Sequence, residues 1–163
     1  RRQRQMCIRD RYYTTTCVIQ FSYKILGFSI SERSINKMKK LYKSKSCGTI
    51  VGKVFDDGGV LACCGEDMEE LVPKTADLAT EKHVPVVECD GNLVKVTVGS
   101  TLHPMTEEHH IQFIILETNL GFQRKALKVD GEPVATFAIQ DGEKVVAAYE
   151  YCNIHGFWVN ELN

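Results

Sequence analysis

The residues of this 163-residue chain that are best suited to chemistry are five histidines and one cysteine in its second half. The histidines all follow residue 82 and lie in three segments: EKHVP at 81–85, HPMTEEHHI at 103–111 and YCNIHGFW at 151–158. The last segment places Cys152 three residues before His155. A thiolate combined with imidazoles suits iron, copper or zinc rather than magnesium or calcium. We therefore expect these three segments to build one transition-metal site.

The adjacent histidines His109 and His110 are expected to point in different directions. The residues at 111, 113 and 115 are apolar and share the parity of His109 along the predicted strand, whereas His110 has the opposite parity. We therefore expect His109 to share the apolar face of that strand and to be the ligand of the pair.

The elements that must position these side chains are short strands. The turn signals are Asp90-Gly91-Asn92, Asp130-Gly131 and Asp141-Gly142. Strand-like runs around them lie at 84–88, 94–98, 109–115, 122–128, 134–139 and 145–151. About seven short strands with turns every 8–12 residues are typical of an immunoglobulin-like antiparallel β-sandwich. The fold class expected is therefore all-β.

Composition excludes several classes of protein. The chain is 44% hydrophobic and 25% charged, with 12 Gly and 4 Pro, which is typical of a globular domain. The sequence contains no run of about 18 apolar residues, the length that would indicate a membrane span. Its net charge of -1 argues against nucleic-acid binding. The chain has seven cysteines, an odd number, and no convincing secretory signal. Both features favour thiols that bind metal in a reducing compartment over a framework of disulfides. We expect a cytoplasmic protein.

Charge divides the chain near Met38. Residues 1–37 contain eight Lys/Arg and two Asp/Glu, whereas residues 38–163 contain twelve and nineteen. The string Met6–Arg11 resembles the translation of a sequencing adapter, so residues 1–37 are expected to be a non-native or disordered extension, with Met38 as the true start. A poor signal peptide is the alternative for this segment.

The three histidine segments resemble the motifs of the superoxide reductases in the desulfoferrodoxin and neelaredoxin family. The resemblance extends over residues 42–158 and includes the order and spacing of the histidines and of Cys152-x-x-His155. It implies an immunoglobulin-like sandwich that holds one mononuclear non-haem iron. Carried over residue by residue, the resemblance implies four equatorial nitrogen ligands, from His83, His103, His109 and His155. It implies Cys152 as the axial ligand, with an open position on the opposite side of the iron.

The same resemblance implies the reaction. Superoxide would be reduced by one electron to hydrogen peroxide with uptake of two protons, and an external donor would re-reduce the iron. Lys82 resembles the family's cation beside the open position, where it would attract superoxide. Glu81 would bind the ferric ion in the resting state and yield to substrate or water. The amides of Ile154 and His155 are expected to donate to the Cys152 sulfur.

Cys47, Cys63 and Cys64 resemble ligands of the desulforedoxin-type module of two-iron desulfoferrodoxins. That module has Cys-x-x-Cys followed by Cys-Cys, but Ser44 stands in the first position here. A serine oxygen is a harder and poorer ligand at neutral pH than a thiolate. A degenerate or absent second site is expected. Zinc or iron with Ser44 or water as the fourth ligand, and a sequencing error at that codon, are the alternatives.

The predicted organisation is a degenerate desulforedoxin-like module at 38–73 followed by the iron-binding sandwich at 74–163. Within the module, the turn Asp57-Gly58-Gly59 predicts a hairpin between the apolar runs 50–55 and 60–62.

The expected partners are superoxide, a rubredoxin-like electron donor and a second copy of the chain. One alternative is a copper electron-transfer sandwich that uses Cys152, two histidines and Met105. Another is a zinc-stabilised binding module.

Overall fold

The computed structural model describes residues 40–54, 58–75 and 83–162. In these ranges the regular structure consists of strands, and there is no helix that could cross a membrane. The predicted extension at 1–37, Met38, and the residues Glu81 and Lys82 lie outside the described residues.

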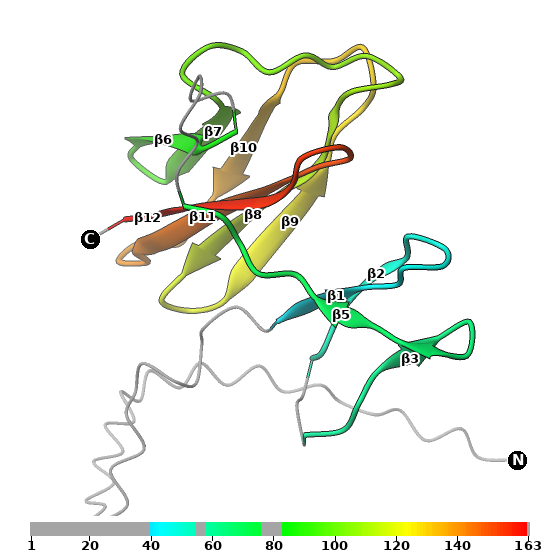
Figure 1. Ribbon diagram of the computed structural model, residues 1–163. Coiled ribbons are helices and arrows are strands. Elements are labelled where there is room, and N and C mark those ends of the chain that lie inside the picture. Colours follow the sequence, from blue (N-terminus) through cyan, green and yellow to red (C-terminus); the bar gives the residue numbers. More distant parts are fainter. Residues whose placement is uncertain (1–39, 55–57, 76–82, 163) are drawn as a thin grey trace, which may run out of the picture. The chain divides into compact units, whose positions relative to one another are not determined.

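Seven strands form the two antiparallel sheets of a sandwich (Figure 1). The three-stranded sheet has the order β10-β7-β6 and contains β6 (Pro85–Asp90), β7 (Leu93–Val98) and β10 (Val134–Ala138). The four-stranded sheet has the order β12-β11-β8-β9 and contains β8 (Ile111–Thr118), β9 (Phe122–Ala126), β11 (Val145–Cys152) and β12 (Gly156–Glu161). The predicted all-β fold class is confirmed.

The three predicted turns are present, and each uses a backbone conformation that its residues allow. Gly91 (φ 55°), Asp130 (φ 62°) and Gly142 (φ 81°) all adopt positive φ values. Glycine adopts this conformation without steric cost, and aspartate tolerates it better than most residues. The Gly91 turn joins the paired strands β6 and β7, whereas the turns at Asp130 and Gly142 lead from one sheet of the sandwich to the other.

The main core lies between the two sheets. Val94, Val96 and Val98 alternate along β7 and are fully buried against Ile114 and Leu116 of β8. Burial of one such side chain contributes about 1.5–3 kcal/mol. The alternating residues 94–98 therefore form the predicted half-buried strand, and its valine side chains face the core.

The four-stranded sheet is apolar on its other face as well. Phe113, Ile115, Tyr149, Tyr151, Phe157 and Val159 form a second buried cluster there, with Ala147. Leu41, Ile50 and Leu71 pack against this cluster, and Lys43 Nζ donates to the Tyr151 hydroxyl at 2.8 Å. The N-terminal strands thus cover an apolar surface that would otherwise face water.

The N-terminal module consists of five short strands. They are β1 (Leu41–Lys43), β2 (Ile50–Gly52), β3 (Ala62–Cys63), β4 (Glu66–Asp67) and β5 (Glu69–Glu70). The predicted hairpin around Asp57-Gly58-Gly59 is wrong, because β2 pairs with β1 and β3 pairs with β4. Two hairpins form instead: β1 and β2 are joined by the turn at 44–49, and β3 and β4 by a turn that contains Cys64 and Gly65, both at positive φ.

The predicted face-sharing of His109 with the apolar residues of the next strand is also wrong. Strand β8 begins at Ile111, so His109 lies in the preceding loop. The register between β8 and β11 shifts near Ile111, which leaves Ile111 and Phe113 on opposite faces of the sheet. A bulge of this kind re-aims side chains at the end of a strand.

Glu150 on β11 gives the fold a specific pH dependence. It is fully buried, and neither carboxylate oxygen has a partner. Burial raises the pKa of Glu150 to about 9. A carboxyl group whose pKa is higher in the folded protein than in the unfolded chain destabilises the fold as the pH rises above the pKa of the unfolded chain. We therefore expect the free energy of unfolding to fall by about 3 kcal/mol between pH 5 and pH 7 from this group.

Urea unfolding at a series of pH values measures this slope in the wild type and in Glu150→Gln. Because the variant lacks the ionisable group, its free energy of unfolding should fall by about 3 kcal/mol less than that of the wild type between pH 5 and pH 7, whereas Glu132→Gln at an exposed position should follow the wild type. Equal slopes in the wild type and Glu150→Gln would contradict the assignment.

Candidate metal centre

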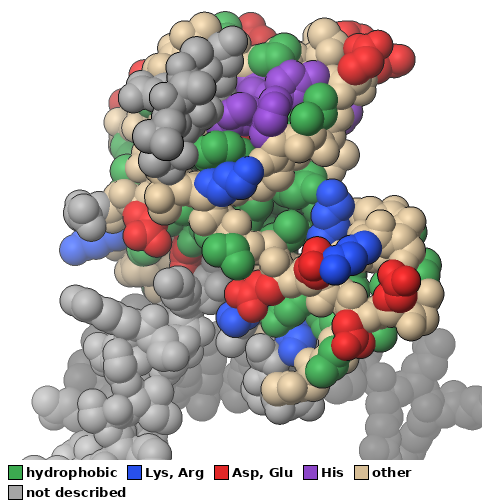
Figure 2. Space-filling view, viewed as in Figure 1, with side chains coloured by type: hydrophobic (Ala, Val, Ile, Leu, Met, Phe, Trp, Pro, Cys, Tyr) green, Lys and Arg blue, Asp and Glu red, His purple; other side chains and the backbone are tan. Residues whose placement is uncertain are grey.

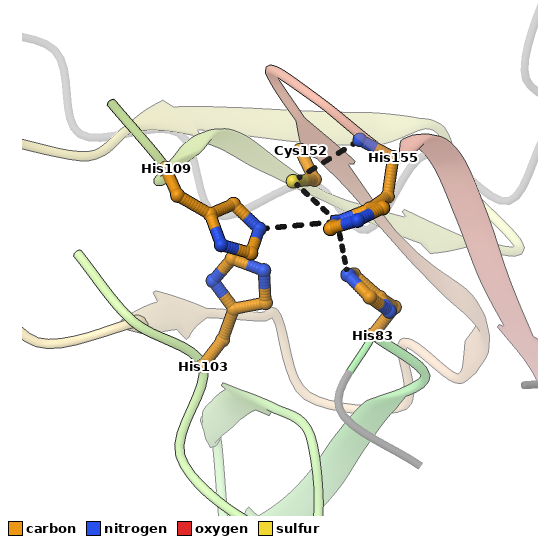
Figure 3. Close-up of side chains that lie close together, drawn as sticks. All are labelled: His83, His103, His109, Cys152 and His155. Atoms are coloured by element: carbon orange, nitrogen blue, oxygen red, sulfur yellow. Dashed lines mark hydrogen bonds between the residues drawn. The ribbon is translucent and has the colours of Figure 1, made fainter. Parts of the chain in front are cut away.

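Four histidines and one cysteine meet at one end of the sandwich (Figure 3). His83 lies two residues before β6, and His103 and His109 come from the long connection between β7 and β8. Cys152 ends β11, and His155 lies in the turn to β12. The ligand atoms of all five residues lie within 4.8 Å of one another. The structure thus brings together the five residues that the sequence predicted as metal ligands.

The four imidazole rings stand at the corners of a square. Neighbouring ring centroids lie 5.0 Å (His83–His103), 4.4 Å (His103–His109), 4.7 Å (His109–His155) and 4.6 Å (His83–His155) apart. The diagonal from His83 to His109 is 6.5 Å. A square of nitrogen donors is the arrangement that an ion needs in its equatorial plane.

The nitrogen separations fit a bound first-row transition metal. The Nδ1 atom of His155 lies 2.9 Å from His83 Nε2 and 3.0 Å from His109 Nε2. Two nitrogens at right angles, each about 2.1 Å from an ion, would be about 3.0 Å apart. The rings therefore already have the spacing of a coordinated set.

His103 shows most clearly that the cluster is built for an ion. Its Nδ1 atom faces the carbonyl oxygen of Pro104 at 2.6 Å. This contact selects the tautomer with a lone pair on Nε2. The Nε2 atom is buried and has no hydrogen-bond partner. Burial lowers the pKa of His103 to about 4, so the ring is neutral and able to bind metal at pH 7.

Cys152 contributes a buried sulfur that backbone amides support. The amide of His155 donates to Cys152 Sγ at 3.4 Å. Burial raises the pKa of the Cys152 thiol, while the amides of His155 and Ile154 and the charge of Lys74 act in the opposite direction. The predicted amide contacts to the sulfur are present. They stabilise negative charge on a sulfur that lies away from water.

Three further residues hold the ligands in place. Trp158 stacks on the His83 ring at a centroid distance of 4.8 Å and an interplanar angle of 13°. Lys74 Nζ lies 5.0 Å over the Trp158 ring and donates to the His155 carbonyl oxygen at 3.0 Å. The side chain of Asn153 joins the two ligand loops, because it accepts the His110 amide and donates to the Glu108 carbonyl oxygen. Sequence reasoning missed Trp158, Lys74 and Asn153, since they act through packing and backbone contacts.

Two residues near the cluster have other roles. The His110 ring faces the carbonyl oxygen of Thr106 with Nδ1 at 3.0 Å, and it does not join the ligand group. Met105 is buried in the main core, where its sulfur accepts the Ile111 amide at 3.4 Å. His109, and not His110, therefore lies in the cluster of possible ligands, although the strand parity behind that prediction is wrong.

A second group of possible metal ligands lies in the N-terminal module. Cys63 Sγ is 3.6 Å from Cys47 Sγ and 3.7 Å from Cys64 Sγ. Ser44 is buried, and its hydroxyl accepts the Cys47 amide at 3.3 Å. The Ser44 hydroxyl, followed by contacts with Thr49 and Cys63, lowers the pKa of the Cys47 thiol to about 6. The neighbouring Cys63 thiol raises the pKa of Cys64 to about 11. This group offers three sulfurs where a tetrathiolate iron site needs four.

Known proteins resemble both parts of the chain. The desulfoferrodoxin family model matches residues 75–161, and the model of the desulfoferrodoxin N-terminal domain matches residues 36–71. Desulfoferrodoxin from Nitratidesulfovibrio vulgaris is 48% identical over 122 residues, which cover 75% of this chain and 95% of that protein. Superoxide reductase from Pyrococcus horikoshii is 39% identical over 107 residues, which cover 55% of this chain and 92% of that protein. The crystal structure of the superoxide reductase from Treponema pallidum superposes with a TM-score of 0.66 and 41% identity, covering 75% of this chain and 97% of that one.

Alanine substitutions of His103, inside the cluster, and of His110, outside it, test the proposed ligand set. His103→Ala removes the orphaned Nε2 donor and should weaken binding of ferrous iron by more than about 100-fold. His110→Ala removes a neighbouring ring outside the cluster and should leave the affinity within about twofold of wild type. Anaerobic titration with a competing chelator measures both. Equal losses in the two variants would contradict the assignment.

Proposed function

The chain belongs to the desulfoferrodoxin family, and from that premise we propose that it is a superoxide reductase whose iron is held by His83, His103, His109, His155 and Cys152. The observation that carries the proposal is the square of four imidazoles with one buried sulfur beside it. The orphaned Nε2 of His103 and the nitrogen spacing of about 3 Å show that the residues fit such an ion. When bound, the iron supplies the single electron that reduces superoxide.

The ligand set favours an anionic substrate. Four neutral imidazoles and one thiolate leave a ferrous ion with a net positive charge, which attracts superoxide. The low pKa of His103 keeps one of these imidazoles neutral at pH 7.

Substrate would reach the cluster from its exposed side. His83, His103 and Cys152 are buried, whereas His155 is exposed and His109 is half-buried. Histidine side chains are visible at the molecular surface in the space-filling view (Figure 2). This asymmetry lets a small anion approach while the sulfur stays dry.

Lys82 and Glu81 are the proposed catalytic residues. Both lie outside the described residues, but Lys82 is adjacent in sequence to His83, a member of the cluster. A cation within reach of the exposed side would attract superoxide and favour proton delivery to the reduced product. Glu81 is proposed as a ligand of the oxidised centre that gives way to substrate or water.

The same proposal includes the protein that donates electrons, the oligomeric state, the cellular location and the limits of the two domains. A one-electron reduction requires an external donor, for which we propose a small rubredoxin-like protein, and we propose a homodimer as the working form. The free thiols of Cys47, Cys63, Cys64, Cys89 and Cys152 favour a reducing, cytoplasmic location. The family-model matches at 36–71 and 75–161 support a module at 38–73 and a sandwich at 74–163.

The copper electron-transfer alternative is not favoured. It requires Met105 as a ligand and leaves two histidines without a role. Met105 instead packs in the core with its sulfur on the Ile111 amide, and four of the five histidines join the cluster.

Lys82→Ala should lower the rate constant for superoxide reduction about tenfold or more, because it removes a charge that steers the anion. Lys144→Ala, just before β11 at the end opposite Cys152, is the matched control and should react at the wild-type rate. Pulse radiolysis measures the rate, and metal analysis should give the same iron content for all three proteins. A wild-type rate in Lys82→Ala would remove Lys82 from the mechanism.

Cys152→Ser tests the sulfur ligand. A serine oxygen is a poorer electron donor than a thiolate, so the oxidised variant should lose the thiolate-to-iron absorption band and most of its activity. Cys89→Ser, which changes an exposed thiol on β6, should keep both. An unchanged band in Cys152→Ser would contradict the assigned ligand set.

A further inference from the structure

We propose that Cys47, Cys63 and Cys64 form a three-thiolate site for a thiophilic d10 cation, Zn²⁺ in the first place, with its fourth position open to solvent. The site replaces the redox-active tetrathiolate iron that the resemblance to two-iron desulfoferrodoxins implies. It lies in the N-terminal module and does not depend on the activity proposed for the sandwich.

The three sulfurs already have nearly the spacing of a loaded zinc site. The separations are 3.6 Å for Cys47–Cys63 and 3.7 Å for Cys63–Cys64, and all three sulfurs lie within 4.8 Å of one another. In a tetrahedral site with Zn–S bonds of about 2.3 Å, neighbouring sulfurs are about 3.8 Å apart. Little movement is needed to admit an ion, and the exposed thiols of Cys47 and Cys64 leave it a route of entry.

Two tight turns impose this spacing. In the first, the Gly48 amide donates to the Ser44 carbonyl oxygen at 3.0 Å, and Gly48 has a φ of 74°. In the second, Cys64 has a φ of 55°, a conformation that residues other than glycine adopt rarely. Strained backbone of this kind is found where a side chain must be held for a ligand. Here it holds the Cys64 thiol beside Cys63.

Ser44 explains why the site should not hold the iron centre of the two-iron proteins. Its side chain is 2% exposed, and its hydroxyl is engaged by Cys47, since it accepts the Cys47 amide at 3.3 Å. A neutral hydroxyl is a hard donor that does not replace a thiolate at a soft metal. The chain therefore supplies three sulfurs, and the fourth position is left to water.

Zinc fits three thiolates and one water better than iron does. Zn²⁺ has no preference of geometry from its d electrons and binds cysteine sulfur tetrahedrally. It also binds nitrogen and sulfur sites more tightly than Fe²⁺.

Lys45 is next to Ser44 in the first turn and adds a positive charge, partly offset by its ion pair with Glu69 at 2.6 Å.

A bound ion would stabilise a module that has little core of its own. Among its described residues only Ser44 is fully buried, and Leu41, Ile50 and Leu71 are partly buried against the sandwich. Domains this small usually need a metal or disulfides to fold. The ion would link the Ser44–Gly48 turn to the β3–β4 hairpin.

The test uses the full chain with iron loaded in the sandwich. Wild type and the control Cys89→Ser should bind one additional Zn²⁺ per chain in a chelator competition, and Co²⁺ at the same site should give a sulfur-to-cobalt absorption band. Cys47→Ser and Cys64→Ser should bind Zn²⁺ more than about 100-fold less tightly and lose the cobalt band. Equal zinc affinity in wild type and Cys47→Ser would overturn the proposal, as would a Cys47–Cys63 disulfide in protein isolated without oxygen.

Ser44→Cys provides the complementary test. By completing four sulfurs, it should allow iron reconstitution to produce a visible ferric-tetrathiolate spectrum, which we predict to be absent from reconstituted wild type. Ser44→Ala should remain without that spectrum and still bind Zn²⁺. A ferric-tetrathiolate spectrum in reconstituted wild type, or its absence in Ser44→Cys, would show that Ser44 does not decide which metal binds.

Discussion

The pairing of β11 with both β8 and β12 is the constraint on which the site depends. Cys152 stands opposite Ile111 on one side and Gly156 on the other. This pairing fixes the end of β11 and the turn that carries His155 against the loop that carries His109. Since a metal site tolerates errors of only a few tenths of an ångström, the ligands need strands rather than loops alone to hold them. The hydrogen-bonded sheet supplies this precision.

The packing beside the ligands extends the same support. Trp158 stands opposite Glu150 on the neighbouring strand and stacks on His83. Lys74 lies over the tryptophan and reaches the His155 carbonyl oxygen. These contacts orient two of the four rings and bring a positive charge towards the thiolate. The site therefore combines a buried sulfur with an exposed side, which suits a reaction in which a small anion arrives and an uncharged product leaves.

The members of the cluster could be predicted because the three histidine segments resemble the motifs of the superoxide reductase family, whose order and spacing are specific. His83, His103, His109, Cys152 and His155 were identified without coordinates, and the structure brings them together. Trp158, Lys74 and Asn153 were missed because stacking and backbone contacts leave no pattern in one sequence. His109 joins the cluster, but the strand-parity argument for it was wrong, since the bulge near Ile111 breaks the alternation on which strand parity rests.

The N-terminal module was the hardest part to predict, for a physical reason. Its strands are two or three residues long, too short for hydrophobic periodicity to reveal them. The Asp57-Gly58-Gly59 signal suggested a hairpin, whereas the strands pair as β1 with β2, β3 with β4, and β1 with β5, a partner distant in sequence. The packing of Leu41, Ile50 and Leu71 on the sandwich is a tertiary effect of the same kind.

The central claim is that the cluster of four histidines and Cys152 reduces superoxide without dismutating it. The most direct measurement is the stoichiometry of products when the reduced, iron-loaded protein reacts with a known amount of superoxide. We predict one hydrogen peroxide for each superoxide consumed, with no oxygen released. Release of one oxygen for every two superoxide molecules would show dismutation and would contradict the account.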